Sequence, residues 1–377
     1  MNPETSLSTR VARTLWAQAP RLVASLIIAG GFVWLFRRGG LPLIPTRSAF
    51  QKLTIWAVPS YAVLIALGVW FRAHRWVYLL RPIAPEASAR RVVGVCFVGF
   101  AAILFAPLRL GEAARPYLLA RDGKVSFFQG LGAAGAERVV DGLVLMLVSA
   151  VAMTLATPLS PLPNRLGDMP VPVSAVPHAI YIALLVFASA FAALIVFYGA
   201  REVAHRFTHR LLDPLSIRLA NFVTDTLERL ADGLKVLASP HDRLRFFGET
   251  LLYWACTFLA TWALMRGSGM PGSLPEACVS LGVLGLGAII PAGPGFFGTY
   301  QIATYTGLAL FFEQDTVLSS GAAMVFISYA TQLLITFLAG ALGFWILGRA
   351  ERVAQPSNDE PRAHGTAEGA TRSSNRF

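Results

Sequence analysis

Three charged residues stand at steps of three in a stretch bounded by two prolines. Arg109, Glu112 and Arg115 lie between Pro107 and Pro116, and residues three apart share one stripe of a helix. Proline starts a helix well but cannot continue one, so we predict that a new helix begins at Pro116 with its free N–H groups pointing at the break. With Arg115 beside them, these groups would bind a phosphate or another anionic head group, and Glu112 would pair with either arginine in its absence. The alternative is a charged loop just outside a membrane.

A second cluster of charges, Glu137, Arg138 and Asp141, precedes a strongly apolar segment that runs from Gly142 to Leu155. Glu137 and Asp141 are four apart and share a helical face. A charge within a membrane span is costly and usually faces a partner or a water-filled cavity. The alternative is a helix start at the membrane surface, where acidic residues favour the N-terminus. We favour a functional role, because the three charges cluster without residues typical of a loop.

A third stretch, from Pro291 to Gln301, has the pattern Pro-x-x-Pro-Gly-x-x-Gly. Its prolines and glycines let the backbone turn sharply and expose N–H groups. We expect a helix to begin near Thr299, which would give a second N-terminus for an anion, with Thr299, Tyr300 and Gln301 as neutral hydrogen-bonding residues. The alternative is a packing kink, although a single proline would be enough for that.

The composition is that of an integral membrane protein. Of 377 residues, 55% are hydrophobic and 14% are charged, whereas a soluble domain carries about 25% charged residues. The net charge of +11 indicates basic cytoplasmic loops and contact with anionic lipid rather than with nucleic acid. The sequence has no Gly-x-x-x-x-Gly-Lys loop, no Gly-x-Ser-x-Gly elbow, no His-Glu-x-x-His motif and no cysteines at metal-ligand spacing. We therefore expect neither an enzyme nor a bound metal or cofactor.

Apolar runs predict an all-α polytopic membrane protein with about six to nine transmembrane segments. The runs cover residues 22–36, 53–71, 92–107, 125–156, 177–199, 246–266, 276–291, 297–312 and 321–348. The short runs beside the two breaks predict half-helices or re-entrant hairpins. We assign 22–350 to a single transmembrane domain, 1–21 to a cytoplasmic N-terminal segment and 351–377 to a disordered cytoplasmic tail.

Basic residues predict the orientation of the chain in a cell inner (plasma) membrane. The amphipathic segment 200–245 is rich in arginine, whereas 157–176 holds only Arg165 and 267–275 holds no lysine or arginine. We therefore place 200–245 and the C-terminal tail in the cytoplasm and the other two segments outside. Two hairpins that enter from opposite faces would form an inverted repeat.

At these residues the chain resembles the lysylphosphatidylglycerol synthase transmembrane-region family, also called flippase-like membrane proteins. The family pattern reads approximately Pro-x-Arg-x-Gly-Glu-x-x-Arg, then Glu-Arg-x-x-Asp, then Pro-Gly-x-x-Gly. Its matches, in a resemblance that spans about 20–350, are Pro107, Arg109, Gly111, Glu112, Arg115, Glu137, Arg138, Asp141, Pro294, Gly295 and Gly298. The family often has an acid after the last motif, where this chain has Gln301, which argues against proton coupling at this position. The resemblance implies the lipid-translocating part of the family without its soluble synthase domain.

The leading interpretation is an ATP-independent flippase or transporter that moves an anionic phospholipid or an isoprenoid-linked lipid between leaflets. The residues assigned to binding and transport are Arg109, Glu112, Arg115, Glu137, Arg138, Asp141, Pro294, Gly295, Gly298 and Gln301. One alternative is a non-transporting lipid-binding scaffold, which would regulate an envelope-lipid glycosyltransferase or synthase through segment 200–245. A membrane-embedded transferase with Glu137 or Asp141 as general base ranks lowest, because no nucleophile or metal set is visible.

Overall fold

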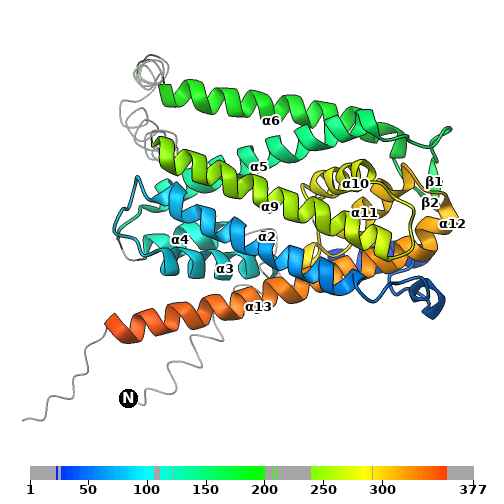
Figure 1. The fold of residues 1–377 in the computed structure, drawn as a ribbon, viewed down its shortest axis with the longest axis horizontal. Helices are drawn as coiled ribbons and strands as arrows, with labels where there is room; N and C mark the ends of the chain where they lie inside the picture. The colour runs from blue at the N-terminus through cyan, green and yellow to red at the C-terminus, as the bar shows by residue number, and fades with distance from the viewer. Residues whose placement is uncertain are drawn as a thin grey trace, which may run out of the picture.

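Within the described residues of the computed structural model, each apolar run contains a helix, and helices make up most of the fold (Figure 1). The structure describes residues 23, 27–105, 111–121, 123–199, 206, 210, 239–290 and 292–354. The predictions for 1–21, for Arg109, for most of segment 200–245 and for the tail beyond 354 lie outside these residues.

A helix over residues 27–38 begins the continuous part of the described chain. The main helices that follow are α2 (Ala57–Leu80), α3 (Ala89–Phe105), α4 (Ala114–Ala120), α5 (Phe127–Leu155), α6 (Val176–Gly199), α9 (Pro240–Gly267), α10 (Leu274–Gly287), α11 (Thr299–Ala309) and α13 (Ala322–Ala354). Short helical turns lie between them: η1 (Arg47–Phe50), η3 (Val173–Ala175), η5 (Pro294–Phe296), α12 (Gln314–Thr316) and η6 (Val317–Gly321). Two short strands, β1 (Arg165–Leu166) and β2 (Met169–Pro170), pair antiparallel.

Within the described residues, four helical segments are long and apolar enough to cross a membrane: Ala57–Leu80, Phe127–Leu155, Val173–Val196 and Gln314–Arg349. The fold is therefore that of a helical membrane protein. The predicted total of about six to nine spans also includes shorter or more polar helices. That total, the re-entrant segments and the inverted repeat stay predictions.

Side-chain caps fix where the long helices begin. Ser126 and Gln129 form a reciprocal capping box at the start of α5, since the Gln129 N–H donates to Ser126 Oγ and the Ser126 N–H donates to Gln129 Oε1. Ser239 caps α9, and Pro240 occupies its first turn, where a missing N–H costs nothing. Residues 240–245 therefore belong to the long helix α9.

Two helical hairpins approach each other from opposite ends of the bundle (Figure 1). α3 and α4 form the first, on either side of the break that contains Glu112, and α10 and α11 form the second, on either side of η5. α5 packs against both hairpins, because its Gly130 lies against Pro116 of α4 and its Leu145 lies against Gly285 of α10. One long helix thus aligns the two breaks.

α6 lies at the edge of the bundle and packs mainly against α5 (Figure 1). Nearly all of its remaining surface is exposed. Phe187 of α6 covers Gly142 of α5, where any side chain would collide with the phenyl ring. The contact between these two helices is therefore close at this point, although α6 has few other neighbours.

Two helix boundaries differ from the predictions. α2 continues to Leu80, whereas the apolar run ends at residue 71, because α9 packs along α2 and encloses its polar residues. α4 begins at Ala114 rather than at Pro116, so Arg115 lies within its first turn.

The second break turns sharply through residues with positive φ. Gly295 has φ 68°, Phe296 has φ 60° and Gly298 has φ 94°. The Gly298 N–H donates to Gln301 Oε1 at 2.8 Å, so this side chain caps α11, which begins at Thr299 as predicted. Only glycine adopts the conformation at 298 without strain.

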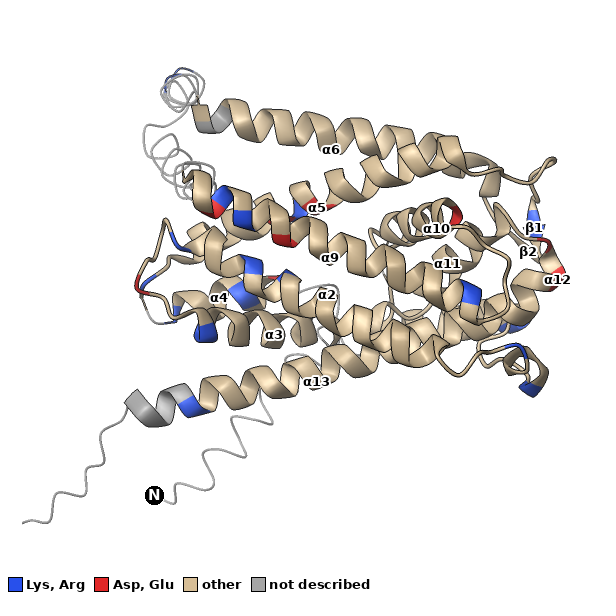
Figure 2. Ribbon diagram, viewed as in Figure 1, with Lys and Arg blue, Asp and Glu red and all other residues tan. Residues whose placement is uncertain are grey.

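Basic residues lie at both ends of the bundle but are more numerous at one (Figure 2). The first end holds the β1–β2 hairpin and the connection from α9 to α10, which are the two segments predicted to lie outside, together with the basic segment 37–52. The second end holds the last residues of α6 and α13 and the start of α9. Its described basic residues include Arg81, Arg90, Arg91, Arg121, Lys124, Arg243, Arg245 and Arg349.

We expect Gly298→Ala to destabilise the protein. A Cβ at this position would collide with Phe32, and strained backbone and overpacking each cost about 1–3 kcal/mol. The melting temperature of the purified protein in detergent should fall. Gly135→Ala is the matched control, because nothing lies within 4 Å of a Cβ there and alanine favours a helix by about 1 kcal/mol. Equal melting temperatures for the two variants would contradict a strained turn at Gly298.

Candidate functional site

Arg75 of α2 is completely buried and joins α2 to α5 and α9. Its Nη1 and Nη2 donate to Oδ1 and Oδ2 of Asp141, each at 2.7 Å, so this pair is bidentate. Nη2 also donates to Glu137 Oε1 at 2.7 Å, and Nη1 donates to Thr250 Oγ1 at 3.0 Å. The Trp254 indole N–H donates to Asp141 Oδ1 at 3.3 Å. Short charged hydrogen bonds are the strong ones, so this network fixes three helices relative to one another.

Arg115 of α4 extends this network to the first hairpin. Its Nη1 donates to Glu137 Oε2 at 2.7 Å, so Glu137 bridges two arginines. The guanidinium lies 4.5 Å from the ring centroid of Trp76 and 5.3 Å from that of Phe100, which is cation–π geometry. Gly99 leaves room for it, because a Cβ there would overlap the arginine side chain. Arg115 therefore lies buried behind the cavity described next, and not on its surface.

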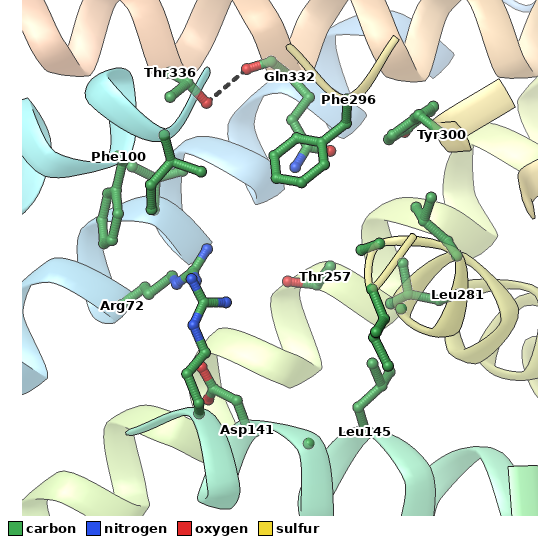
Figure 3. A pocket seen from close by; sticks show the side chains of 18 of the residues that line it. Arg72, Phe100, Asp141, Leu145, Thr257, Leu281, Phe296, Tyr300, Gln332 and Thr336 are labelled. Atoms are coloured by element: carbon green, nitrogen blue, oxygen red, sulfur yellow. Dashed lines mark hydrogen bonds between the residues drawn. The ribbon is translucent and has the colours of Figure 1, made fainter. Parts of the chain in front are cut away.

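A cavity of about 420 Å³ lies beside this network, between the two hairpins (Figure 3). Glu112 borders it from the first break, and Gly295 and Phe296 border it from the second. The two breaks therefore meet at one cavity. Its volume falls within the range of about 300–1,000 Å³ that is typical of small-molecule sites.

The lining of the cavity is charged on one side and neutral on the other. Its charged residues are Arg72, Glu112, Arg138 and Asp141, and its neutral polar residues are Thr257, Thr299, Tyr300, Tyr329, Gln332 and Thr336. Apolar residues such as Val69, Leu145 and Leu281 complete the walls. Figure 3 shows Arg72 and Asp141 on the side of the cavity opposite Tyr300 and Gln332. Such a lining suits an amphipathic ligand with a charged group.

Glu112 pairs with Arg138, whereas the sequence predicted a pair with Arg109, which lies outside the described residues, or with Arg115. Arg138 Nη2 donates to Glu112 Oε1 at 3.4 Å, and the two side chains are 42% and 40% exposed. The reason is that α5 runs beside the first hairpin and presents Arg138 to the break, while Glu137 on the same helix occupies Arg115. The pair is long and solvated, so it exchanges partners more easily than the buried pairs of Arg75.

Three residues of the last motif have different places in the structure. Gly295 borders the cavity, whereas Pro294 and Gly298 shape the turn behind it. Gln301 is buried, and its side-chain oxygen is occupied by the Gly298 N–H. The anion-binding site predicted at the N-terminus of α11 is thus partly occupied by the side chain of Gln301.

Two arginines of this site, Arg72 and Arg75, have no role in the predictions from sequence, which end the second apolar run at residue 71. Their spacing carried a signal, because residues three apart share a helical face. In the structure this face turns toward Glu137 and Asp141, the carboxylates for which a partner was expected.

No group of three or more histidine, cysteine or carboxylate side chains that could hold a metal occurs among the described residues. The carboxylates of the site instead bind arginines of the same chain.

Comparison with known proteins gives one match. The family model described as the lysylphosphatidylglycerol synthase TM region matches residues 21–340, which include both breaks and every residue that borders the cavity. No curated protein and no solved structure matches the chain.

Arg75→Met should destabilise the protein by about 3–5 kcal/mol, because it removes the only direct cation partner of Asp141 among the described residues and one of the cations bound to Glu137. We expect a large fall in melting temperature in detergent. Arg138→Met is the control, since its exposed pair with Glu112 is worth about 1 kcal/mol or less. If both variants melted at the temperature of the unaltered protein, the buried network would not be what holds the helices together.

Proposed function

The chain belongs to the lysylphosphatidylglycerol synthase TM region family, and from this premise we propose that it is an inner-membrane transporter that moves an anionic lipid between leaflets without ATP. The family relates the chain to membrane lipids. The cavity between the two breaks is the observation that supports binding and transport of an anionic lipid. It combines arginines, which attract an anionic head group, with apolar walls that suit the amphipathic character of a lipid.

The dimensions of the cavity suit a head group rather than a whole lipid. A volume of about 420 Å³ accommodates a phosphate and a small substituent but is too small for two acyl chains as well. The head group would enter the cavity while its chains stay in the bilayer. Ile289 borders the cavity and is 62% exposed, so it gives the chains an apolar edge to lie against.

The ion pairs around the cavity are of two strengths, and this difference suits a transport cycle. The pair of Arg75 and Asp141 is buried and bidentate, and it would hold the helices together throughout. The pair of Arg138 and Glu112 is long and solvated, so an arriving anion would take the place of Glu112 at little cost. The glycines of the second break would provide the backbone freedom for a hairpin to move.

The charges of the protein and of the ligand bear on the orientation of the chain in the membrane and on the driving force for transport. The end of the bundle with the larger number of basic residues would face the cytoplasm, together with the C-terminus. The two hairpins would then enter the membrane from opposite faces as re-entrant segments. The sequence has no ATP-binding loop, so the membrane potential would act on the moving anion, at about 2.3 kcal/mol per elementary charge for each 100 mV.

Reconstitution in vesicles tests this proposal. The purified protein should speed the exchange of a fluorescent anionic phospholipid between leaflets, compared with vesicles that lack it. Arg138→Gln should slow this exchange at least about tenfold, the effect of about 1.4 kcal/mol, because it removes the exchangeable cation of the cavity. Arg266→Gln is the control, since this exposed residue at the end of α9 does not border the cavity.

Absence of lipid exchange by folded protein, with and without an imposed membrane potential, would refute the proposal. That result, together with co-purification of an envelope-lipid glycosyltransferase or synthase, would favour the non-transporting scaffold instead.

A further inference from the structure

His74 of α2 and Glu249 of α9 form a hydrogen-bonded pair that does not border the cavity. His74 Nδ1 lies 2.6 Å from Glu249 Oε1, and the two side chains are 28% and 15% exposed. A contact this short needs a proton between the two atoms, so the Nδ1–H donates to the carboxylate. A further proton would bind at Nε2, the other ring nitrogen, while Oε2 of Glu249 is buried without a hydrogen-bond partner. The pair therefore carries one negative charge without this further proton and no net charge with it.

Aromatic rings fix the imidazole of His74 in this position. The ring of Trp70 stacks on it, with 5.7 Å between centroids and 10° between planes, and the ring of Tyr78 meets it edge-on at 5.4 Å. These three residues follow one another at steps of four along α2, so they share one face of the helix. Histidine is the residue whose ordinary change of charge falls between about pH 5 and 8. The pair therefore contains a group suited to proton exchange.

The charged groups that face this pair come from both helices. Arg81 of α2 and Arg245 of α9 lie 5.3 and 5.7 Å from the ring centroid of Tyr78, which itself faces Glu249. Arg81 also binds Asp242 of α9 at 3.0 Å. α3 and α13 also pack against α2, and their titratable residues in the described chain are Arg90, Arg91, Cys96, Tyr329 and Arg349.

The pair lies near the end of the bundle that holds more basic residues. His74 precedes Leu80, the last residue of α2, by six positions, which is about 9 Å along a helix. Arg81 follows directly at that end. Since both side chains of the pair are partly exposed, we expect the pair to exchange protons with solvent at this end.

The pair also adjoins the buried ion pairs of the cavity. The next residue of each helix, Arg75 and Thr250, hydrogen-bond to each other at 3.0 Å across the same interface. Tyr253, one turn after Glu249, borders the cavity, and the guanidinium of Arg72 lies 5.6 Å from its ring centroid. A change of charge in the pair is therefore felt by the arginines of the cavity.

The ion pairs around the cavity hold one more positive charge than negative. Within the described chain they comprise four arginines and three carboxylates: Arg72, Arg75, Arg115, Arg138, Glu112, Glu137 and Asp141. The carboxylate of Glu249 offsets this excess while His74 is neutral. An anion in the cavity would then leave one negative charge too many, which a proton on His74 would remove. A net charge is costly in surroundings of low dielectric constant, so the anion and the proton favour each other's binding.

We propose, building on the proposed function, that His74 and Glu249 form a proton-binding site that fills when an anion enters the cavity and empties when the anion leaves. The proton comes from solvent at the basic end of the bundle, adds to Nε2 of His74 and returns to the same solvent. The anion therefore remains the charge that crosses the membrane. Because binding takes up a proton, the affinity for the anion rises as the pH falls and declines as the pH rises.

Calorimetric titration of the full chain in non-ionic detergent tests this linkage, with short-chain phosphatidylglycerol as the anionic probe. Its phosphodiester keeps one negative charge throughout the range in which histidine titrates, so proton uptake belongs to the protein. Binding heats in buffers of different ionisation enthalpy should show this uptake, and the affinity should rise about tenfold from about pH 8 to about pH 6. Proton release, or binding without proton exchange, would overturn the proposal.

Variants locate the proton. His74→Gln should abolish its uptake because Nε2 is lost, and Glu249→Gln should abolish it because the negative charge that holds the proton is lost. His178→Gln is the matched control, since this exposed histidine lies at the start of α6, at the opposite end of the bundle. Proton uptake that persists unchanged in both variants of the pair would refute the site.

A measurement without lipid tests the same coupling. Nuclear magnetic resonance of the chain with ¹⁵N-labelled histidine reports the protonated fraction of His74, whose signal is identified by its loss in His74→Gln. At about pH 7, Arg72→Gln removes a positive charge as an anion would offset one, so it should raise this fraction. Glu112→Gln removes a negative charge from an exposed side chain and should lower it. Unchanged fractions in these variants would contradict the linkage.

The proton site and lipid transport fail separately. Proton uptake with the expected losses in the variants, but no lipid exchange in vesicles, would refute transport and support the site. Lipid exchange that is the same in His74→Gln and in the unaltered protein at every pH would support transport and refute the site. If phosphatidylglycerol did not bind at all, the proposed function would fail, and the resonance measurement would still decide on the site.

Discussion

The bidentate pair between Arg75 and Asp141 constrains the whole helical bundle. A guanidinium without a partner is costly to bury, so α2 tolerates Arg75 only where α5 supplies carboxylates and α9 supplies Thr250. Glu137 also fixes the position of α4, because its second oxygen accepts a hydrogen bond from the buried Arg115. Four helices thus depend on one set of charges for their relative positions, in surroundings where apolar contacts alone give little directional preference.

The same interactions determine the charge that the cavity offers to a ligand. Since Asp141 and Glu137 are occupied by buried arginines, the acids cannot attract a cation from the cavity. Among the described residues, what remains accessible is Arg72, whose ion pair with Glu137 is 3.9 Å long, and Arg138, whose pair with Glu112 is 3.4 Å long. Fold stability and ligand preference are therefore two consequences of one arrangement, and substitutions in the buried pairs would change both.

The sequence predicted the helices well, because apolar length and the Gly/Pro content of a break are local properties of the chain. It identified Glu137 and Asp141 as buried charges in need of a partner. The partner itself was not predictable, because Arg75 is 66 residues from Asp141 and follows the end of an apolar run. The pairing of Glu112 with Arg138 and the burial of Arg115 against Trp76 likewise depend on how α5 meets the first hairpin. Local spacing can show that Arg72 and Arg75 share a helical face, but it does not show which distant segment that face contacts.

The position of α6 has a consequence for how a lipid would leave the cavity. In water, separation of α6 from α5 would expose apolar surface at a large cost, but in a bilayer acyl chains solvate that surface as well as protein does. The opening of this seam would therefore cost only the close packing of residues such as Phe187, which covers Gly142 and borders the cavity. The bilayer itself could supply the missing wall. A ligand with acyl chains would then change leaflets through a lateral slit and never withdraw its chains from the hydrocarbon solvent.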